Sequence, residues 1–415
     1  MSNFLMRFIS IFLGTNFFLF FTLMGNSWPN WLGPNFNGSI EEVLPDVENL
    51  QMEWQKNVGE GWAAPVVSDE TVFLHDRSGA LESLTAYELS GGQEKWRYSF
   101  ESNYRDDFGM ENGPRSTPAV AQGILLSHNP EGRIHALNSK TGKLIWTRDL
   151  QLDFGSSKGF FGRCSSPLVL GGKVFFDAGG EKAGVIALAL NTGKTLWKST
   201  SYGNDYASVV PLRTNNTLSI VAFMREGLVV LDANNGRELF FERFQSPINA
   251  SVNAATPLIL NNGIFLSSCY EVGAGYWSFS SVKSAKNIMN LWRKKGVLDC
   301  HYSTPVQKGD FLFGFHGRQE RGSLLRCIRL SDGEVMWTAP AMGTGHLIRI
   351  GDQILCLTEG GELILFKAKS RGFEIELRQQ VLGAGRSHFA YADGKILARD
   401  KRRLVCLKWG NGNNR

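Results

Sequence analysis

The stretch His135-Ala136-Leu137-Asn138-Ser139-Lys140-Thr141-Gly142-Lys143-Leu144-Ile145-Trp146 decides the fold, because its pattern recurs along most of the chain. An alternating apolar segment runs into a polar turn that contains a glycine, and a second segment ends on an aromatic residue. The aligned copies end at Trp96, Trp146, Trp197, Phe240, Trp292 and Trp337. Four positions earlier stand Gly92, Gly142, Gly193, Gly236, Ile288 and Gly333. This pattern predicts a β-hairpin whose turn glycine has a positive φ.

Two further landmarks complete the repeat. Ten positions before the aromatic residue the side chain is small or β-branched, which indicates tight packing: Ala86, Ala136, Ala187, Val230, Val282 and Cys327. A proline opens each unit, at Pro65, Pro118, Pro167, Pro211, Pro257 and Pro305. Another short apolar segment lies between the proline and the hairpin, so each unit has four strands. The spacing of the prolines fits the period of about 40–50 residues that is typical of propeller blades.

The two ends of the chain fix the number of blades. Degraded units open near Leu347 and Phe389, and the last of them has three strands without a fourth. The segment 50–54 at the other end reads as a strand without its three partners. Joining the two ends closes the ring and leaves no exposed sheet edge. We therefore predict an all-β, eight-bladed propeller of four-stranded antiparallel blades, spanning residues 50–409 as one domain, with a disordered tail at 410–415.

The start of the chain predicts export. Residues 1–27 carry a single charge, Arg7, before an apolar stretch, which is typical of a secretory signal peptide; the alternative is an uncleaved membrane anchor. We expect the mature protein in the periplasm or cell envelope. Residues 28–49 are rich in turn formers and aromatics, which indicates an extended lead-in that lies against the ring surface with its tryptophans buried.

Composition excludes several classes of protein. The formal net charge is +5 and the basic residues are scattered, so no nucleic-acid groove is expected. The six cysteines form no CxxC motif, which argues against zinc, and no metal site is predicted. We expect them to be small buried hydrophobes, with a disulfide between Cys269 and Cys300 as the alternative. A closed ring also predicts a monomer, with envelope association left open.

The meander topology sorts the loops between two faces. The turns between third and fourth strands lie on one face, and the longer, chemically varied crossovers lie on the other. We therefore expect the binding-face residues to gather around the mouth of the central channel: Trp62, Tyr104, Arg105, Asp106, Asp107, Asn112, Arg115, Lys158, Arg163, Asp205, Tyr206, Arg225, Asn253, His301, Tyr302, His316 and Arg318.

Two interpretations of these residues stay open. As a binding site they offer guanidinium groups for carboxylates, aromatic faces for stacking, and a histidine near neutral pH. As structure, the same charges neutralise one another, as Arg105 does with Asp106 or Asp107. His301 is a general base, a binding contact or a structural histidine, and no catalytic residue is assigned.

The strings Thr141-Gly142-Lys143-Leu144-Ile145-Trp146 and Thr192-Gly193-Lys194-Thr195-Leu196-Trp197 resemble the pyrroloquinoline-quinone-like β-propeller repeat family. The resemblance covers roughly residues 50–407. The stretches 28–35, 61–67, 104–109 and 251–257 look like exported single-propeller members. The family includes calcium- and quinone-dependent alcohol dehydrogenases. It also includes cofactor-free propellers such as the outer-membrane assembly lipoprotein, which holds partner proteins through its rim.

The resemblance implies two functions. The adjacent cysteines and the haem-type CxxCH of the dehydrogenases are missing, and their calcium ligands match no stretch here. The favoured expectation is a binding or scaffold module for a protein partner or a small anionic or polar ligand, without a cofactor. The alternative is an alcohol or sugar dehydrogenase that uses pyrroloquinoline quinone with calcium. In it the cofactor would stack on Trp62 or Tyr302, Arg115 and Arg163 would pair with its carboxylates, and Asp107 or Asp205 would lie near calcium.

Overall fold

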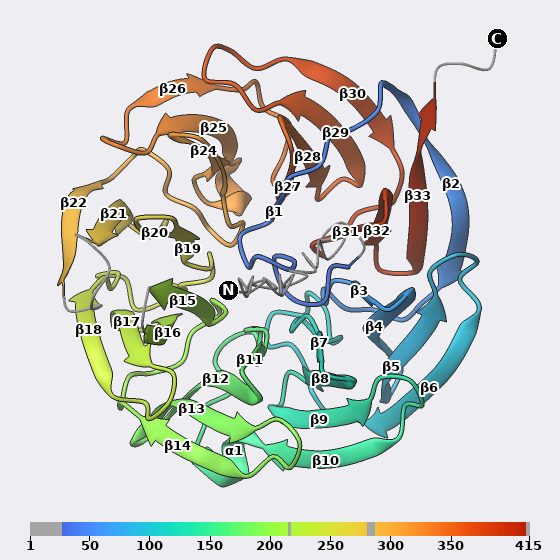
Figure 1. The fold of residues 1–415 in the computed structure, drawn as a ribbon, viewed down its shortest axis with the longest axis vertical. Coiled ribbons are helices and arrows are strands. Elements are labelled where there is room, and N and C mark those ends of the chain that lie inside the picture. Colours follow the sequence, from blue (N-terminus) through green and yellow to red (C-terminus); the bar gives the residue numbers. More distant parts are fainter. Residues whose placement is uncertain (1–26, 215–216, 280–286, 412–415) are drawn as a thin grey trace, which may run out of the picture.

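A computed structural model of the chain describes residues 27–214, 217–279 and 287–411, and in them eight antiparallel sheets form a closed ring (Figure 1). Seven of the sheets have four strands, and the sheet of blade seven has a fifth strand, which the lead-in contributes. The prediction of an all-β, eight-bladed propeller is confirmed.

The strands are given from the channel outward. Blade one consists of β3 (Val66–Ser68), β4 (Thr71–Ser78), β5 (Leu81–Glu88) and β6 (Glu94–Glu101), and blade two of β7 (Ala119–Ala121), β8 (Ile124–His128), β9 (Arg133–Asn138) and β10 (Leu144–Asp149). Blade three consists of β11 (Leu168–Leu170), β12 (Lys173–Gly180), β13 (Ala183–Ala189) and β14 (Thr195–Ser199), and blade four of β15 (Val210–Thr214), β16 (Thr217–Phe223), β17 (Gly227–Asp232) and β18 (Glu238–Arg243). Blades five to seven are β19 (Leu258–Leu260), β20 (Gly263–Ser268), β21 (Gly273–Phe279), β22 (Ile288–Lys294); β23 (Val306–Lys308), β24 (Phe311–His316), β25 (Leu324–Arg329), β26 (Val335–Thr338); β27 (Gly345–Ile350), β28 (Gln353–Thr358), β29 (Glu362–Lys367), β30 (Ile375–Gln380). The eighth is β31 (Ala390–Ala392), β32 (Lys395–Arg399), β33 (Arg403–Asn411), β2 (Val47–Asn57). A short helix α1 (Leu150–Phe154) and a 3-10 turn η2 (Gln319–Arg321) lie in the connections.

The ring closes as the sequence indicates. β2 pairs antiparallel with β33 and places Trp54 opposite Cys406, so the N-terminal strand is the outermost strand of blade eight. The pairing continues to Asn411 opposite Val47, which corrects two boundaries. The lead-in ends at residue 46, and residues 410 and 411 belong to a strand rather than to a tail. Residues 412–415 lie outside the described part of the chain.

The repeated glycine and tryptophan meet across neighbouring blades. Gly142, with φ +70°, packs on the ring of Trp96 from the preceding blade, and a Cβ added to it would lie 2.5 Å from that ring. The Trp96 indole N–H donates to the carbonyl of Ser139 in the same turn, at 3.0 Å. The same contact recurs for Gly92 on Trp54, Gly193 on Trp146, Gly236 on Trp197, and Gly333 on Trp292. The motif therefore joins neighbouring blades at five of the eight junctions.

Blade five departs from the sequence alignment. Trp292 pairs with Tyr276 and not with Val282, which lies outside the described residues. In five other blades the predicted small residue does oppose the aromatic one, as Ala136 opposes Trp146. The third strand, β21, already ends at Phe279, so it lies earlier in the sequence than the alignment placed it.

A belt of hydroxyl groups links the inner ends of the blades. The backbone N–H of each residue donates to the side-chain oxygen of the next in the order Ala64, Thr117, Ser166, Ser208, Thr256 and Thr304, at 2.8–3.3 Å. At the same level of the channel, blades seven and eight contribute His346 and His388, whose ring centroids lie 4.7 Å apart. The belt satisfies backbone groups that no ladder reaches.

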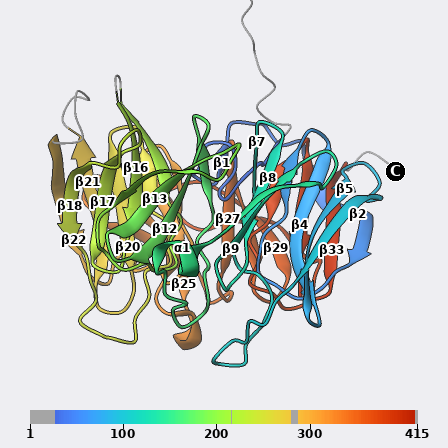
Figure 2. The ribbon, with the colours of Figure 1, turned by 90° about the horizontal axis from the view of Figure 1, so that it is seen from below.

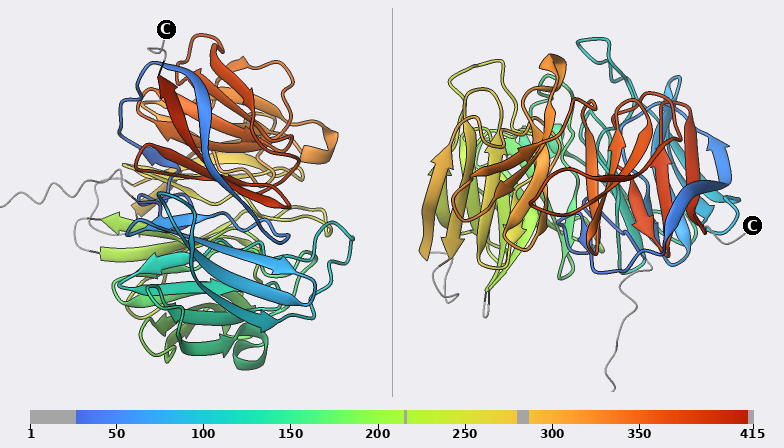
Figure 3. Two further views of the ribbon diagram at one scale, coloured as in Figure 1. Left: turned by 90° about the vertical axis from the view of Figure 1, so that its right-hand side faces the viewer. Right: turned by 90° about the horizontal axis from the view of Figure 1, so that it is seen from above.

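The lead-in closes one end of the channel. Trp28 is 2% exposed and pairs with Val67, while β1 (Ser39–Ile40) adds a parallel strand to β27. Between them the Trp31 indole N–H donates to Thr256 at 3.0 Å. The expectation that this segment lies on the ring surface is therefore incomplete, because Trp31 reaches the channel itself. In Figures 2 and 3 the blue lead-in lies on the face opposite the long cyan and orange loops.

The cysteines are all free thiols, and five of them are buried, which supports their role as small hydrophobes. The alternative disulfide is not formed; instead the Cys269 N–H donates to the Cys300 carbonyl at 2.9 Å. Cys164 differs, since it is half-buried near the channel mouth. Within the described ranges, no helix has the length and apolar character needed to span a membrane. The predicted signal peptide, residues 1–27, lies almost entirely outside these ranges.

Candidate functional site

The long crossovers surround a cavity at the channel mouth, which we call the cup. Its volume is about 240 Å³, and every blade contributes to its wall. The lining residues are Trp31, Trp62, Met110, Arg115, Phe161, Cys164, Ser166, Tyr206, Ser208, Val252, Ala254, Tyr270, His301, Tyr302, Gln319, Glu320, His346, Arg386 and His388. The lead-in forms its floor through Trp31, so the cup is open only toward the loop face.

One wall of the cup is built around the ion pair between Arg115 and Asp106. Their nitrogen and oxygen lie 3.0 Å apart, and the two side chains are 3% and 0% exposed. Arg115 also donates to the Phe161 carbonyl at 2.6 Å and stacks over Trp62, with its guanidinium carbon 4.2 Å from the ring centroid. This arginine therefore fixes two neighbouring crossovers to each other.

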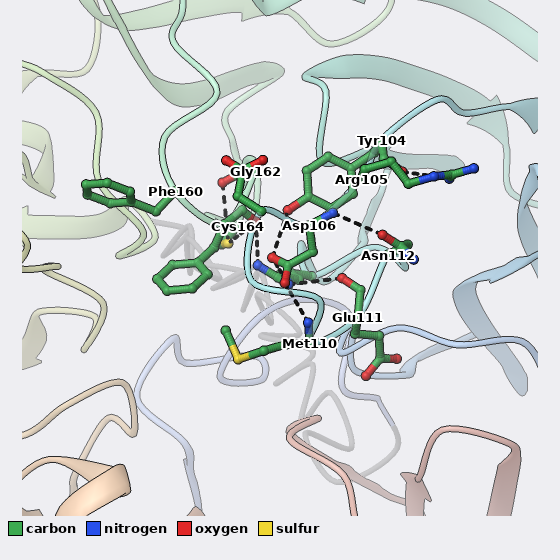
Figure 4. A network of polar contacts seen from close by, with 12 residues as sticks. Tyr104, Arg105, Asp106, Met110, Glu111, Asn112, Phe160, Gly162 and Cys164 are labelled. Carbon is green, nitrogen blue, oxygen red and sulfur yellow. Dashed lines mark hydrogen bonds and ion pairs between the residues drawn. The ribbon is translucent and has the colours of Figure 1, made fainter.

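The loop 103–115 folds on the carboxylate of Asp106 (Figure 4). The Met110 N–H donates to it at 2.7 Å, and the Asn112 side-chain oxygen accepts from the Asp106 N–H at 3.0 Å. Burial alone would raise the pKa of Asp106, but these hydrogen bonds and the Arg115 charge hold it below its usual range. The carboxylate is thus a structural anion, satisfied within its own loop.

A second ion pair lies on the other side of Trp62 along the wall, between Arg386 and Glu359. Arg386 lies 3.0 Å from Glu359, which also accepts hydrogen bonds from the Tyr302 hydroxyl at 2.5 Å and from Gln319 at 3.0 Å. The Arg386 guanidinium lies 5.1 Å from the centroid of Trp62. Two guanidinium groups therefore contact Trp62, and each is neutralised by a carboxylate.

His301 lines the cup from the crossover between blades five and six. Its Nε2 is 2.9 Å from the Tyr270 hydroxyl, and its Nδ1 accepts a long hydrogen bond of 3.4 Å from the Gln319 N–H. Burial lowers the pKa of His301 to about 4, so the ring is neutral near pH 7. A base this weak is poorly matched to proton abstraction at neutral pH, which favours a contact or structural role over that of general base.

An aromatic patch continues from the cup onto the loop face. Phe108 and Phe160 are 59% and 45% exposed, and the rings of Phe108 and Phe161 lie 5.1 Å apart. Tyr206 closes the series, 5.7 Å from Phe161. We call these four residues the rim patch.

Five of the predicted binding-face residues line the cup: Trp62, Arg115, Tyr206, His301 and Tyr302. The remaining twelve do not line the cup: Tyr104, Arg105, Asp106, Asp107, Asn112, Lys158, Arg163, Asp205, Arg225, Asn253, His316 and Arg318. Lys158 and Asp107 form an exposed ion pair of 2.7 Å near the rim patch. Arg105 does not pair with Asp106 or Asp107 but donates to the Tyr104 carbonyl at 3.1 Å.

Several of these residues hold the loops together. Arg163 is buried and donates to the carbonyls of Asp177 and Ala178, and Asn253 donates to the carbonyl of Met224. Arg225 and Asp205 form an ion pair of 3.3 Å. Burial nevertheless raises the pKa of Asp205 to about 7, so desolvation outweighs the arginine there.

The last two residues lie near blade six. His316 accepts a hydrogen bond from the Asp299 N–H at 3.0 Å. Arg318 pairs with Glu320 at 2.6 Å and lies over the Tyr270 ring. Both support the hairpin between β24 and β25, whose tip is η2.

Sequence reasoning missed the residues supplied by irregular parts of the chain. Arg386 and His388 stand directly before the innermost strand of blade eight, where other blades carry Arg115 or Arg163 before a proline. The missing proline hid this correspondence. Trp31 and Glu359 carried no signal, because only the tertiary fold brings the lead-in and a β28–β29 turn to the channel.

The quinone alternative does not fit these residues. Arg163, expected to pair with the cofactor, is occupied by backbone carbonyls, and Arg115 is neutralised by Asp106. Among the described residues no three His, Cys, Asp or Glu side chains are grouped so that they could hold calcium. The carboxylates expected near calcium are engaged, Asp107 with Lys158 and Asp205 with Arg225.

The sequence comparisons identify the family of the chain. Residues 81–339, more than half of the chain, match the family model described as outer membrane protein assembly factor BamB. The chain belongs to this family. It is 22% identical over 351 residues to BamB of Burkholderia pseudomallei, with 80% of each chain covered. It is 24% identical over 362 residues to BamB of Moranella endobia, with 81% of this chain and 88% of that protein covered.

Quinoprotein dehydrogenases are also related, over shorter stretches. A quinohemoprotein alcohol dehydrogenase of Comamonas testosteroni is 28% identical over 141 residues, which is 33% of this chain and 18% of that enzyme. Among solved structures, BamB from Moraxella catarrhalis superposes with a TM-score of 0.65 at 15% identity, over 89% of this chain and all of that one. The Comamonas dehydrogenase gives 0.65 at 13% identity, over 94% and 82%. These superpositions support the fold alone, which the family's two branches share.

Proposed function

We propose that the chain is a protein-binding scaffold of the cell envelope that holds its partner through the loop face. The observation that carries this proposal is the rim patch, which exposes Phe108 and Phe160 beside the cup. Aromatic residues are enriched in protein interfaces, and exposed apolar patches mark interaction sites. The opposite face ends in short polar turns and the lead-in, and offers no comparable patch among the described residues.

The relatives support the same proposal. The proteins that match over most of this chain are outer membrane protein assembly factors, which supports an exported chain that acts with proteins in the envelope. The dehydrogenases match over about a third of it, and the arginines that line the cup are already paired with carboxylates. An enzymatic function is therefore less well supported. We propose a monomer, because the ring is closed.

Site-specific photo-crosslinking tests this proposal. A benzophenone amino acid replaces Phe108 in the full chain. This variant is expressed in a bacterium whose genome encodes the protein, and the intact cells are irradiated. The matched control places the same group at Lys140, an exposed turn residue of the other face. We expect a discrete adduct from position 108 only, with the partner identified by mass spectrometry.

Two outcomes oppose the proposal. Absence of any adduct at position 108, or equal yields at 108 and 140, would contradict a docking surface on the loop face. Reduction of an artificial acceptor by an alcohol or sugar, only after incubation with pyrroloquinoline quinone and calcium, would instead support the dehydrogenase alternative.

A further inference from the structure

The size of the cup limits what it can hold. Its volume of about 240 Å³ lies below the range of about 300–1,000 Å³ that pockets for drug-sized ligands occupy. The floor is closed, because Trp31 is held by Thr256 and lies edge-on to His388, with ring centroids 5.2 Å apart. The cup therefore suits a single side chain that enters from the loop face, and not a chain threaded through the ring.

The charges of the cup exclude charged occupants. The three guanidinium groups that line it or border it are paired with carboxylates: Arg115 with Asp106, Arg386 with Glu359, and Arg318 with Glu320. His301 is half-buried and His388 is buried, and the lowered pKa of each, about 4, leaves both neutral near pH 7. A charged group entering the cup would lose its hydration without gaining a free counter-charge, which is strongly unfavourable.

The remaining surface of the cup is aromatic and apolar. Trp31 forms the floor, and Phe161, Tyr270 and Tyr302 stand in the wall together with Val252. Aromatic rings in such an enclosure gain stabilisation from stacking in addition to burial. Phe161 belongs both to the cup and to the rim patch, so an occupant of the cup would have its flanking residues over Phe108 and Phe160.

We propose that the cup takes one uncharged aromatic or large apolar side chain at the tip of a partner protein's loop. This inference rests on the proposed scaffold function and names the chemistry by which the partner is recognised. The side chain fills the neutral cavity, and the loop that carries it covers the rim patch. Such an arrangement is a central buried anchor surrounded by weaker contacts, which is how binding energy is distributed in protein interfaces.

Small blocked amino acids test the chemistry directly on the full chain. N-acetyl-tryptophanamide and N-acetyl-phenylalaninamide are compared with N-acetyl-aspartamide and N-acetyl-lysinamide by saturation-transfer NMR and calorimetry. We expect the neutral aromatic probes to bind about tenfold more tightly than the charged ones. Methyl β-glucoside is the competing ligand class, and binding of this sugar as tight as that of the aromatic probes would overturn the inference.

Two cup variants locate the binding. Ala254→Phe fills the cavity, and Phe161→Ala removes part of its wall. Because Phe161 is on a loop, the second variant can be used to test the cup if Ala254→Phe fails to fold. Each is expected to weaken the aromatic probes by about tenfold, while Lys140→Phe on the opposite face leaves them unchanged. Unchanged affinity in a folded cup variant would overturn the inference.

Combining the cup variants with crosslinking separates the two proposals. If the cup receives the partner's side chain, the adduct at position 108 disappears in Ala254→Phe or Phe161→Ala. If the adduct persists at its original yield, the cup is not the docking site and the scaffold proposal survives. If the unmodified chain gives no adduct, the scaffold proposal itself fails.

Discussion

At the scale of single residues, the contact between a turn glycine and the tryptophan of the neighbouring blade explains the repeat. The glycine needs its positive φ for the turn, as the sequence indicates, and it also has no Cβ because the tryptophan ring occupies that space. Blade five has Ile288 at the aligned position, where β22 begins. The two demands on one position explain why glycine recurs there in five of the eight blades.

Gly142→Ala separates these two demands. Both Gly142 and Gly123 have a positive φ, but a Cβ on Gly123 meets nothing within 4 Å. The left-handed backbone costs alanine about 1–2 kcal/mol at either site, and overpacking against Trp96 adds about 1–3 kcal/mol at Gly142 only. We expect urea denaturation to give a larger loss of unfolding free energy for Gly142→Ala than for Gly123→Ala. Equal losses would show that the tryptophan contact is unimportant.

Arg115 provides a second prediction at this scale. Arg115→Ala leaves the buried Asp106 carboxylate without its main partner, and the expected loss of stability is about 3–5 kcal/mol. The double variant with Asp106→Asn removes the orphaned charge and should lose less than the sum of the two single variants. Additive losses measured by denaturation would mean that the pair does not interact.

At the scale of elements, a fully buried network joins blades one and two. On β4, His75 Nδ1 lies 2.8 Å from the Ser127 hydroxyl of β8, and its Nε2 lies 3.0 Å from the Glu82 carboxylate of β5. The order of serine, histidine and carboxylate is that of a hydrolase triad. All three side chains are 0% exposed, however, so no substrate reaches them. The network is therefore a structural link between neighbouring sheets.

Glu82→Gln tests how much this network contributes to the stability of the fold. The substitution replaces one of the carboxylate oxygens that face His75 Nε2 with an amide and leaves buried polar groups without their partners, so we expect a loss of about 1–3 kcal/mol in unfolding free energy. The matched control is Glu94→Gln, since Glu94 pairs with Arg97 at 2.7 Å on the surface with about 40% exposure of both side chains. That pair is worth at most about 1 kcal/mol. A loss for Glu82→Gln as small as that of the control would contradict the structural role.

At the scale of the whole molecule, packing the blades around one channel buries histidines. Burial lowers the pKa of His128, His301 and His388 to about 4 and that of His135 to about 3, and it also lowers the pKa of His346. Below about pH 6.5 these histidines bind protons in the unfolded chain but stay unprotonated in the folded protein. The histidines therefore lower the stability as pH decreases from about 6.5 to about 4, and they outnumber the two carboxyls with a raised pKa, Asp177 and Asp205, which act in the opposite direction.

The acid sensitivity can be measured and assigned. Unfolding free energy determined in urea at several pH values should fall steeply below about pH 6.5, by up to about 1.4 kcal/mol per pH unit for each histidine. A phenylalanine in His388→Phe cannot bind a proton in either state. The decrease of unfolding free energy per pH unit should therefore be smaller in this variant by the contribution of one histidine. A slope identical to that of the unmodified chain would show that His388 does not contribute.

The sequence by itself determined the architecture, because blade structure depends on local rules that repeat. Turn glycines, alternating strands and opening prolines predicted four strands per blade, and the unpaired segments at the two ends predicted how β2 and β33 close the ring. It also placed Trp62, Arg115, Tyr206, His301 and Tyr302 at the channel mouth, since topology assigns each crossover to a face.

Only the tertiary structure decided which of the predicted charges are free to bind. Arg163 and Asn253 are used by backbone carbonyls, while Arg115 is neutralised by a carboxylate nine residues earlier in its own loop. Trp31 and Glu359 join the site from places that no repeat marks, and Arg386 from a repeat position that lacks the proline. A side chain's pairing and pKa depend on neighbours that lie far away in sequence, and such contacts exist only once the ring has closed.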